Sequence, residues 1–215
     1  MTAKNILIYG IGGHARAVYD LACDLQIEVS SFICFESNLE KFLGISVIKS
    51  VEELEKSRKR SIVIAVGDNF IRNSIATALK RNAVFDFPIL VHPTSRISKF
   101  AKLSEGTVVL AGVNVGPFTL IGDFCILNSH SSIDHDCNMG QFSSLGPGVM
   151  TGGNVKIGNR TAVGIGSSIK HNVTIASDVV IGGNSFLNRN IPSGVVAYGI
   201  PATIKKYRKP DDKYL

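Results

Sequence analysis

A six-residue repeat between residues 97 and 187 constrains this chain more than any other feature. Of the sixteen positions reached from Ile97 in steps of six, fifteen are apolar, and Thr151 is the exception. A second column, four residues after each of these, is nearly all small or β-branched, and both columns point to one side of an extended chain. A helical period of 3.6 residues cannot keep this phase, so the repeat predicts a parallel β-helix of about five coils with roughly 18 residues each.

The residues before the repeat follow a different pattern, in which apolar strands alternate with amphipathic helices. A buried strand leads into the glycine loop of residues 10–15 (GIGGHA) and then into a helix, as in doubly wound α/β proteins. The sequence therefore predicts a Rossmann-like domain over residues 1–92 and a β-helix domain with a C-terminal tail over residues 93–215. The expected strands are residues 4–9, 29–35, 61–66 and 84–91, and the expected helices are residues 16–25, 50–60 and 70–81. In the tail we expect a short helix to start over residues 202–206, followed by disorder towards the C-terminus.

Composition and charge narrow the class of protein. No apolar run approaches the roughly 18 residues of a membrane span, and the first residues lack the organisation of a signal peptide, so we expect a cytoplasmic protein with no membrane partner. The net charge of +6 is not accompanied by interleaved basic and aromatic residues, which argues against nucleic-acid binding. Part of that charge lies in the tail, at Lys205, Lys206, Arg208 and Lys209. These side chains either are solvated at the terminus or help to bind the phosphates of a ligand.

The chain has four cysteines, Cys23, Cys34, Cys125 and Cys137. Their spacing fits no zinc motif, and no metal is expected. Because Cys125 and Cys137 fall in the small-residue column of the repeat, we interpret them as core thiols, with a catalytic or disulfide role as the alternative.

The glycine loop and the strand ends mark a candidate ligand site in the first domain. A strand, a glycine loop and a helix N-terminus form a cradle for phosphate, and the spacing G-x-G-x-x-A also fits a relaxed dinucleotide fingerprint. Ligands of such sheets bind at the carboxyl ends of the strands, which here carry residues 10–14, Phe35, Glu36 and Gly67. Glu36 could meet a ribose hydroxyl or could be a solvated strand end. A dinucleotide-dependent oxidoreductase is disfavoured, because 92 residues hold only half of a full dinucleotide fold.

A histidine between two carboxylates is the main chemical anomaly of the repeat. His135 lies in the motif IDHDC, at a position expected to point out of the coil, where it could act as a general base or have a structural role. Gly153 follows 18 residues later and should stack beside it. Its N–H could stabilise an oxyanion, or it could be a corner glycine. The column of Pro147, Ile165 and Gly183 could line a groove for a long thin ligand.

Taken together, these motifs resemble a known family. The GIGGHA loop, the hexapeptide repeat, IDHDC, GGNVKIG and YGIPA are similar to the left-handed β-helix acyltransferases of bacterial sugar biosynthesis, in particular the nucleotide-sugar N-acetyltransferase and sialic-acid O-acetyltransferase group. The resemblance implies a homotrimer with active sites between its subunits. It also implies transfer of an acetyl group from acetyl-CoA to the amino group of a nucleotide-linked amino sugar, for bacterial surface-glycan biosynthesis. Two alternatives stay open, an O-acetyltransferase acting on a sialic-acid-like sugar and a non-catalytic relative that binds sugar nucleotides.

The resemblance also implies roles for residues of this chain. His135 matches the catalytic base, Asp136 its acidic partner and Gly153 the oxyanion donor, for direct attack of the acceptor on the thioester. Relatives often carry a second histidine near the thioester, where this chain has Ser144, which can donate a hydrogen bond but cannot carry a positive charge. The implied acetyl-CoA contacts are Ser144, Ile165 and Gly183, and the implied nucleotide-sugar contacts are Gly12, Gly13, His14, Phe35, Glu36 and Gly67.

Overall fold

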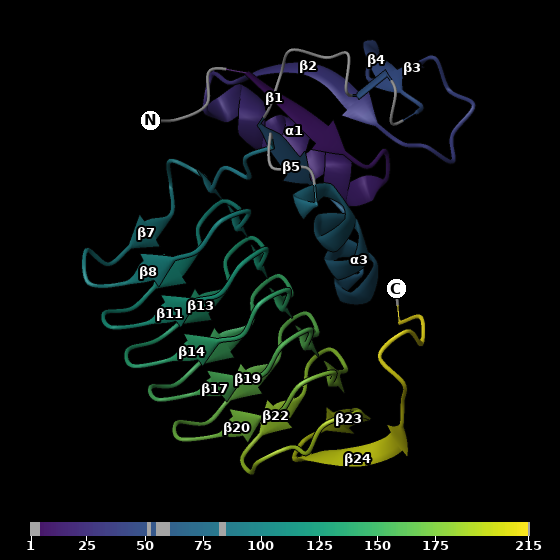
Figure 1. Ribbon diagram of the computed structural model, residues 1–215. Helices are drawn as coiled ribbons and strands as arrows, with labels where there is room; N and C mark the ends of the chain where they lie inside the picture. The colour runs from purple at the N-terminus through teal and green to yellow at the C-terminus, as the bar shows by residue number, and fades with distance from the viewer. Residues whose placement is uncertain (1–4, 51–52, 55–60, 82–84, 215) are drawn as a thin grey trace.

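The computed structural model describes residues 5–50, 53–54, 61–81 and 85–214, and it places an α/β domain at one end of a column of stacked coils (Figure 1). The column is a parallel β-helix, which confirms the prediction from the six-residue repeat. Within the described ranges, no helix is both long and apolar enough to cross a membrane. The boundary expected after residue 92 stays a prediction; β6 (Leu90–Val91) already pairs with the coil strand β9 (Val108–Val109).

A five-stranded sheet forms the centre of the α/β domain. Its order is β3-β4-β2-β1-β5, and all neighbouring strands are parallel except the short β3–β4 pair. Both faces are buried, because α1 (Gly13–Asp24) packs on the face that carries Ile6 and Ile8, and α3 (Asn69–Lys80) packs on the face that carries Leu7. The strands are β1 (Asn5–Tyr9), β2 (Glu28–Ile33), β3 (Lys41–Phe42), β4 (Ile45–Ile48) and β5 (Ile62–Ile64). Of the helix expected over residues 50–60, the structure describes Ser50, Glu53 and Leu54; Glu53 and Leu54 are helical, and Ser50 is not.

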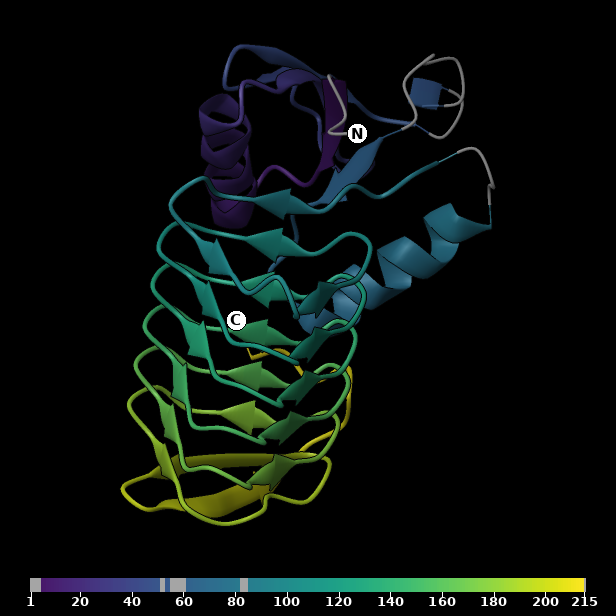
Figure 2. The ribbon, with the colours of Figure 1, turned by 90° about the vertical axis from the view of Figure 1, so that its left-hand side faces the viewer.

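Three parallel sheets form the sides of the β-helix (Figure 2). Each strand pairs with the strand one coil further on, so that Asn114 lies beside Ser132 and Val115 beside Ile133. One side, called face E below, consists of β7 (Arg96–Ile97), β10 (Asn114–Val115), β13 (Ser132–Ile133), β16 (Met150–Thr151), β19 (Ser168–Ile169) and β22 (Phe186–Leu187). The next side consists of β8 (Lys102–Leu103), β11 (Leu120–Ile121), β14 (Asn138–Met139), β17 (Lys156–Ile157) and β20 (Thr174–Ile175). The third side, called face D, consists of β6, β9, β12 (Ile126–Leu127), β15 (Ser144–Leu145), β18 (Ala162–Val163) and β21 (Val180–Ile181), and it continues into β23 and β24.

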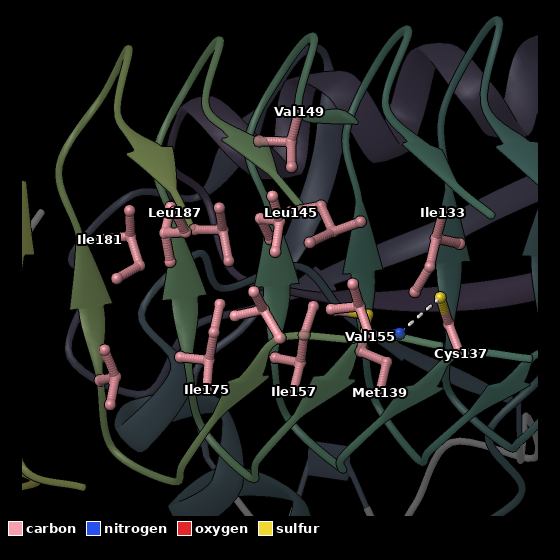
Figure 3. Packing of buried hydrophobic residues seen from close by; sticks show 14 of the residues in the cluster. Ile133, Cys137, Met139, Leu145, Val149, Val155, Ile157, Ile175, Ile181 and Leu187 are labelled. Carbon is pink, nitrogen blue, oxygen red and sulfur yellow. Dashed lines mark hydrogen bonds between the residues drawn. The ribbon is translucent and has the colours of Figure 1, made fainter. Parts of the chain in front are cut away.

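The two columns of the repeat fill the inside of the coils. Ile133, Leu145 and Val149 point inwards and stack with their counterparts in adjacent coils (Figure 3). Cys125 and Cys137 are free and buried in the same interior, which confirms that they are core thiols. The coil corners carry residues in the left-handed backbone region every six residues, and several of these are not glycine. Stacking therefore supplies enough stabilisation to hold unfavourable backbone conformations at the corners.

The C-terminal segment differs from the sequence prediction. Residues 202–206, expected to start a helix, belong to β24 (Ala202–Tyr207), which pairs antiparallel with β23 (Val195–Gly199). The open edge of face D offers unpaired backbone groups, and the returning chain satisfies them as a strand instead of forming a helix. The expected disorder is also wrong for residues 208–214, because Arg208 donates hydrogen bonds to the carbonyls of Asp178, Pro210 and Asp212.

A buried arginine joins the α/β domain to the β-helix. Arg72, on α3, is 1% exposed, and five hydrogen bonds engage its guanidinium. Its acceptors on the coil side are the carbonyls of Phe124 and Phe142, whose rings stack with centroids 5.1 Å apart. The remaining acceptors, in the first domain, are the carbonyls of Val66 and Gly67 and the side chain of Asn69.

Candidate active site

A cleft of about 620 Å³ lies between the α/β domain and face D of the β-helix. One wall is the start of α1 together with the loop after β5, and the other is formed by β12, β15, β18, β21 and the corner that follows them. Residues from both predicted binding sites therefore share one cleft. The lining includes Gly13, His14 and Gly67 from the first domain, Ser144, Ile165 and Gly183 from the coils, and Tyr214 from the tail.

The two helices at this cleft differ in their N-termini. In α3, the Asp68 carboxylate accepts two N–H groups of the first turn, and Tyr214 Oη accepts the N–H of Asn69 at 2.9 Å. In α1, the N-cap residue Gly12 makes no side-chain cap, and the first turn has no acidic residue. Free N–H groups at a helix N-terminus favour anions. The start of α1 is therefore the end that can receive a phosphate.

His14 lies in the first turn of α1 and is partly buried, with its Nε2 atom fully covered. Its Nε2 atom has no hydrogen-bond partner among the described residues. Burial, together with the positive charge of Arg72, lowers the pKa of His14 to about 4. The imidazole is therefore neutral at physiological pH, and its ring lines the cleft with one nitrogen left for a ligand.

The lowered pKa of His14 predicts acid sensitivity of the fold. The pKa of His14 is about 4 in the folded protein and about 6.5 in the unfolded chain, so between pH 4 and pH 6.5 the unfolded chain binds more protons than the folded protein. The His14 contribution to the free energy of unfolding is thus complete above pH 6.5 and is lost as the pH falls through this window, by up to about 3 kcal/mol. Urea unfolding at pH 7 and pH 4.5 should show a smaller pH effect for His14→Gln than for the wild type. The exposed control His171→Gln should keep the wild-type pH effect; equal profiles for wild type and His14→Gln would contradict the prediction.

Three of the predicted nucleotide-sugar residues do not line the cleft. Gly12 precedes α1, is exposed, and has open space where a side chain would stand. Phe35 follows β2 and packs edge-on against Tyr9, and Glu36 is exposed beside it. All three lie at the carboxyl edge of the sheet, as expected. Their role in binding stays a prediction.

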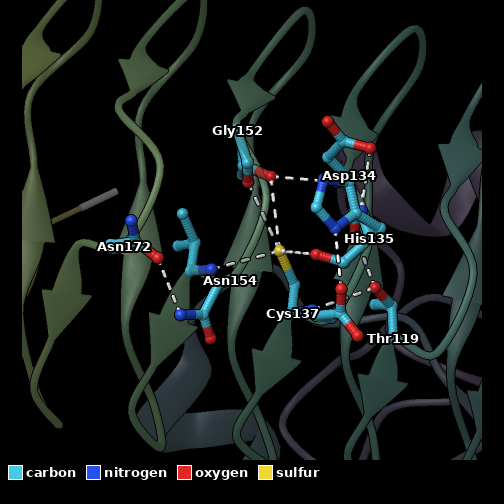
Figure 4. A network of polar contacts seen from close by, with 10 residues as sticks. Thr119, Asp134, His135, Cys137, Gly152, Asn154 and Asn172 are labelled. Carbon is cyan, nitrogen blue, oxygen red and sulfur yellow. Dashed lines mark hydrogen bonds and ion pairs between the residues drawn. The ribbon is translucent and has the colours of Figure 1, made fainter.

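The residues predicted for catalysis form a separate site at the corner after face E (Figure 4). His135 is exposed, and its Nδ1 lies 2.7 Å from Asp136 Oδ2. Asp136 has a φ of 57°, a left-handed conformation that aspartate tolerates better than most residues, and this conformation places it beside the imidazole. The hydrogen bond to Asp136, helped by the negative charge of Asp134, raises the pKa of His135. The arrangement is that of a histidine made more basic by a carboxylate partner.

Gly153 packs directly against the His135 ring. A Cβ added at Gly153 would lie 2.5 Å from His135 Nε2, so only glycine leaves the ring in this place. The next coil continues the stack, because the N–H of Asn172 donates to the Gly153 carbonyl at 3.0 Å. The prediction that positions 135 and 153 stack is therefore correct, while the oxyanion role of the Gly153 N–H stays a prediction.

We expect Gly153→Ala to lower kcat by about 10²-fold, because displacing a catalytic group by about 1 Å can cost this much. The added methyl must push the His135 ring away from its position beside Asp136. Steady-state kinetics would measure the loss. Gly112→Ala is a control for crowding alone, since its methyl would approach a ring nitrogen of another exposed histidine, His130, to the same 2.5 Å. Gly112 also has a φ of 69°, so alanine strains the backbone more at the control position than at Gly153. A Gly153→Ala enzyme as active as the control would contradict the prediction.

The catalytic candidates and the cleft lie at different corners of the same chain. His135, Asp136 and Gly153 follow face E, whereas Ile165 and Gly183 precede it, and none of the first three lines the cleft. A single chain therefore does not bring the predicted base to the predicted acetyl-CoA residues. In the part of the chain that the structure describes, no group of three or more His, Cys, Asp or Glu side chains is arranged to hold a metal ion.

Two residues at the cleft were not expected from the sequence. Arg72 holds the Gly67 carbonyl of the cleft wall, and its charge within an amphipathic helix gave no sign of burial. Tyr214 closes the cleft from the tail, and burial raises the pKa of its hydroxyl. No local pattern in the sequence predicts the position of Tyr214, because its hydroxyl is held by the N–H of Asn69, which is 145 residues away in the chain.

Fold and cleft together define a β-helix transferase of the hexapeptide-repeat class. Profiles described as the PglD N-terminal domain and as the bacterial transferase hexapeptide match residues 5–79 and 154–189. The chain is similar to a solved variant of the GDP-perosamine N-acetyl transferase from Caulobacter crescentus, in complex with CoA and GDP-perosamine. The two sequences are 30% identical, the TM-score is 0.89, and the match covers 94% of this chain and 97% of that chain. The acetyltransferase domain of PglB from Neisseria gonorrhoeae, solved with acetyl coenzyme A, is 28% identical, with a TM-score of 0.88 and coverage of 94% and 100%.

The chain belongs to the PglD-like family of hexapeptide-repeat nucleotide-sugar N-acetyltransferases. Among curated sequences, it is 34% identical over 115 residues to UDP-N-acetylbacillosamine N-acetyltransferase from Bacillus subtilis. This match covers 50% of the chain and 52% of that relative, so it spans about half the length of the curated protein.

Proposed function

We propose that this protein transfers the acetyl group of acetyl-CoA to the amino group of a nucleotide-linked amino sugar, for bacterial surface-glycan biosynthesis. The main support for this proposal is the composition of the cleft. On one side, the uncapped start of α1 and the glycine loop suit the phosphates of a sugar nucleotide. On the other side, the Ile165 side chain, 58% exposed, suits the apolar arm of CoA. The relatives solved with CoA, GDP-perosamine and acetyl coenzyme A support this assignment. The cytoplasmic location stays a prediction.

His135 is the general base of the proposed reaction. The acceptor amine attacks the thioester carbonyl while His135 removes its proton, and Asp136 stabilises the imidazolium that results. The N–H of Gly153 stabilises the tetrahedral oxyanion. His135 then gives the proton to the departing CoA thiolate, so that the base is regenerated. Ser144, on the cleft wall, replaces the second histidine of related enzymes as a hydrogen-bond donor to the acyl group.

The proposed active form is a homotrimer with active sites between subunits. The separation of the His135 corner from the cleft supports this arrangement, because a neighbouring chain could place its own His135 at the cleft. Met150 and Phe186 are exposed on face E, which lies between the two corners and offers an apolar surface for a subunit contact. Light scattering should give three times the chain mass of 23.1 kDa.

The experiment that tests the function is a thiol-release assay with acetyl-CoA and a panel of acceptors. The panel contains UDP-, GDP- and dTDP-linked amino sugars and free sialic acids. CoA release with one nucleotide amino sugar is expected, and the active nucleotide identifies the ligand of the first domain. Release only with a free sialic acid would replace the proposal with O-acetyl transfer. Binding of a sugar nucleotide without CoA release from any acceptor would favour a non-catalytic role.

Mixing two inactive variants tests the shared site. His135→Ala removes the base, and Ile165→Glu places a charge in the cleft at an exposed position. If each site combines the cleft of one chain with His135 of another, mixed trimers regain activity that neither variant has alone. If both halves of the site come from one chain, co-expression of the two variants restores nothing.

A further inference from the structure

Thr151 is the one polar residue in the aliphatic column of the repeat, and the structure shows what its hydroxyl does. Its side chain is buried and points into the coil interior, where the equivalent positions on face E carry aliphatic groups. Its Oγ1 accepts a hydrogen bond from the N–H of Asp134 at 3.1 Å. Asp134 directly precedes His135, so the exception in the repeat lies against the corner that holds the proposed base.

This hydrogen bond replaces a backbone bond of the β-helix ladder. On face E, the residue after each strand donates its N–H to the carbonyl of the residue 17 positions later, as Gly116 does to Ile133 and Gly152 does to Ile169. Asp134 donates to the Thr151 side chain instead. The pairing of β13 with β16 is correspondingly reduced to Ser132 with Met150, whereas the neighbouring pairs on this face keep two residue pairs. The peptide before His135 therefore departs from the regular ladder.

The other bonds of Asp134 tie it to the corner that holds His135. The Asp134 carboxylate accepts the N–H of His135 at 2.8 Å, and the Asp134 carbonyl accepts the hydroxyl of Thr119 from the coil below. The Thr119 bond is ordinary for this β-helix, because Ser143 and Thr161 donate in the same way to carbonyls 15 residues later. The Thr151 bond has no such counterpart among the described residues of face E.

We propose that Thr151 is a positioning residue, which holds the Asp134 peptide out of the ladder so that His135 and Asp136 take their relative orientation. The proposal rests on the proposed role of His135 as general base. A valine at position 151 has nearly the same shape but no hydroxyl, so the Asp134 N–H would return to the backbone carbonyl of residue 151, as at the other positions of face E. The corner would become regular, and the imidazole would move relative to Asp136.

Three variants test this role: Thr151→Val, Thr151→Ser and the control Thr161→Val. Thr161 is also fully buried, and its hydroxyl donates to the Ala176 carbonyl at a corner that does not hold His135. We expect Thr151→Val to lower kcat by about tenfold to 10²-fold, with KM for both substrates and Tm close to wild type. Thr151→Ser, which keeps the hydroxyl, should restore kcat, and Thr161→Val should leave it unchanged. The proposal would be overturned if Thr151→Val kept the wild-type kcat, or if its loss of kcat followed a loss of Tm. It would also be overturned if Thr151→Ser did not restore kcat.

An NMR titration of His135 separates this proposal from the proposed function. The Asp136 contact raises the pKa of His135 in the wild type, and Asp134 and Asp136 are the carboxylates that face it. In Thr151→Val the His135 pKa should fall towards its ordinary value, whereas Thr151→Ser and Thr161→Val should titrate like the wild type. This readout needs no turnover. An unchanged pKa in Thr151→Val would refute the positioning role even if the chain proved inactive towards every acceptor.

Discussion

His135→Ala is expected to lower kcat by about 10²–10⁴-fold, the usual cost of losing a general base. The His135 side chain is 55% exposed and Asp136 is 57% exposed, so the substitution removes little packing, and the proposed trimer and the Tm should be retained. Acetyl-CoA binding, measured by calorimetry, should also persist, because Ser144, Ile165 and Gly183 of the cleft are unchanged. Turnover like that of the wild type would exclude His135 from the mechanism.

The pH dependence supplies the control for this first prediction. The base must be neutral to accept a proton, so kcat/KM should fall as the pH drops below the His135 pKa. The hydrogen bond to Asp136 stabilises the imidazolium and raises that pKa. Asp136→Asn removes the negative charge, and the acidic limb of its pH profile should therefore move to lower pH. An acidic limb that is unchanged in Asp136→Asn would mean that another group titrates.

Arg72→Met is expected to reduce the free energy of unfolding by about 3 kcal/mol or more. Methionine cannot donate, so five acceptors would lose their partner, and each buried polar group left unsatisfied costs about 1–3 kcal/mol. Burial lowers the pKa of Arg72 to about 10, which still leaves it charged at neutral pH. Urea unfolding followed by circular dichroism would measure the change.

Arg81→Ala is a matched control, because Arg81 is exposed at the end of the same helix. Its effect should stay within about 0.5 kcal/mol. Since Arg72 also holds the Gly67 carbonyl in the cleft wall, the Arg72→Met variant should bind the sugar nucleotide more weakly at temperatures where it is still folded. Stability equal to that of Arg81→Ala would show that the domain junction does not depend on this guanidinium.

Local patterns were enough to predict much of this molecule. The β-helix and the positions of Ile133 and Cys137 in its interior follow from a period of six residues, because stacked coils repeat the same environment at a fixed interval. The same arithmetic predicts that Gly153 stacks beside His135. The glycine loop predicts the strand, turn and helix start that face the cleft, since these are made by residues adjacent in the chain.

Contacts between distant segments decided the rest, and no local pattern contains them. The strand at residues 202–207 forms because an open sheet edge is available, and Tyr214 reaches the cleft because α3 offers it an N–H. Arg72 is buried only because two coil corners supply carbonyls to its guanidinium. The sequence by itself determined the periodic fold and the residue types at the histidine corner. Only the tertiary structure decided that His135 lies away from the cleft of its own chain, since that separation depends on which side of the coil the α/β domain covers.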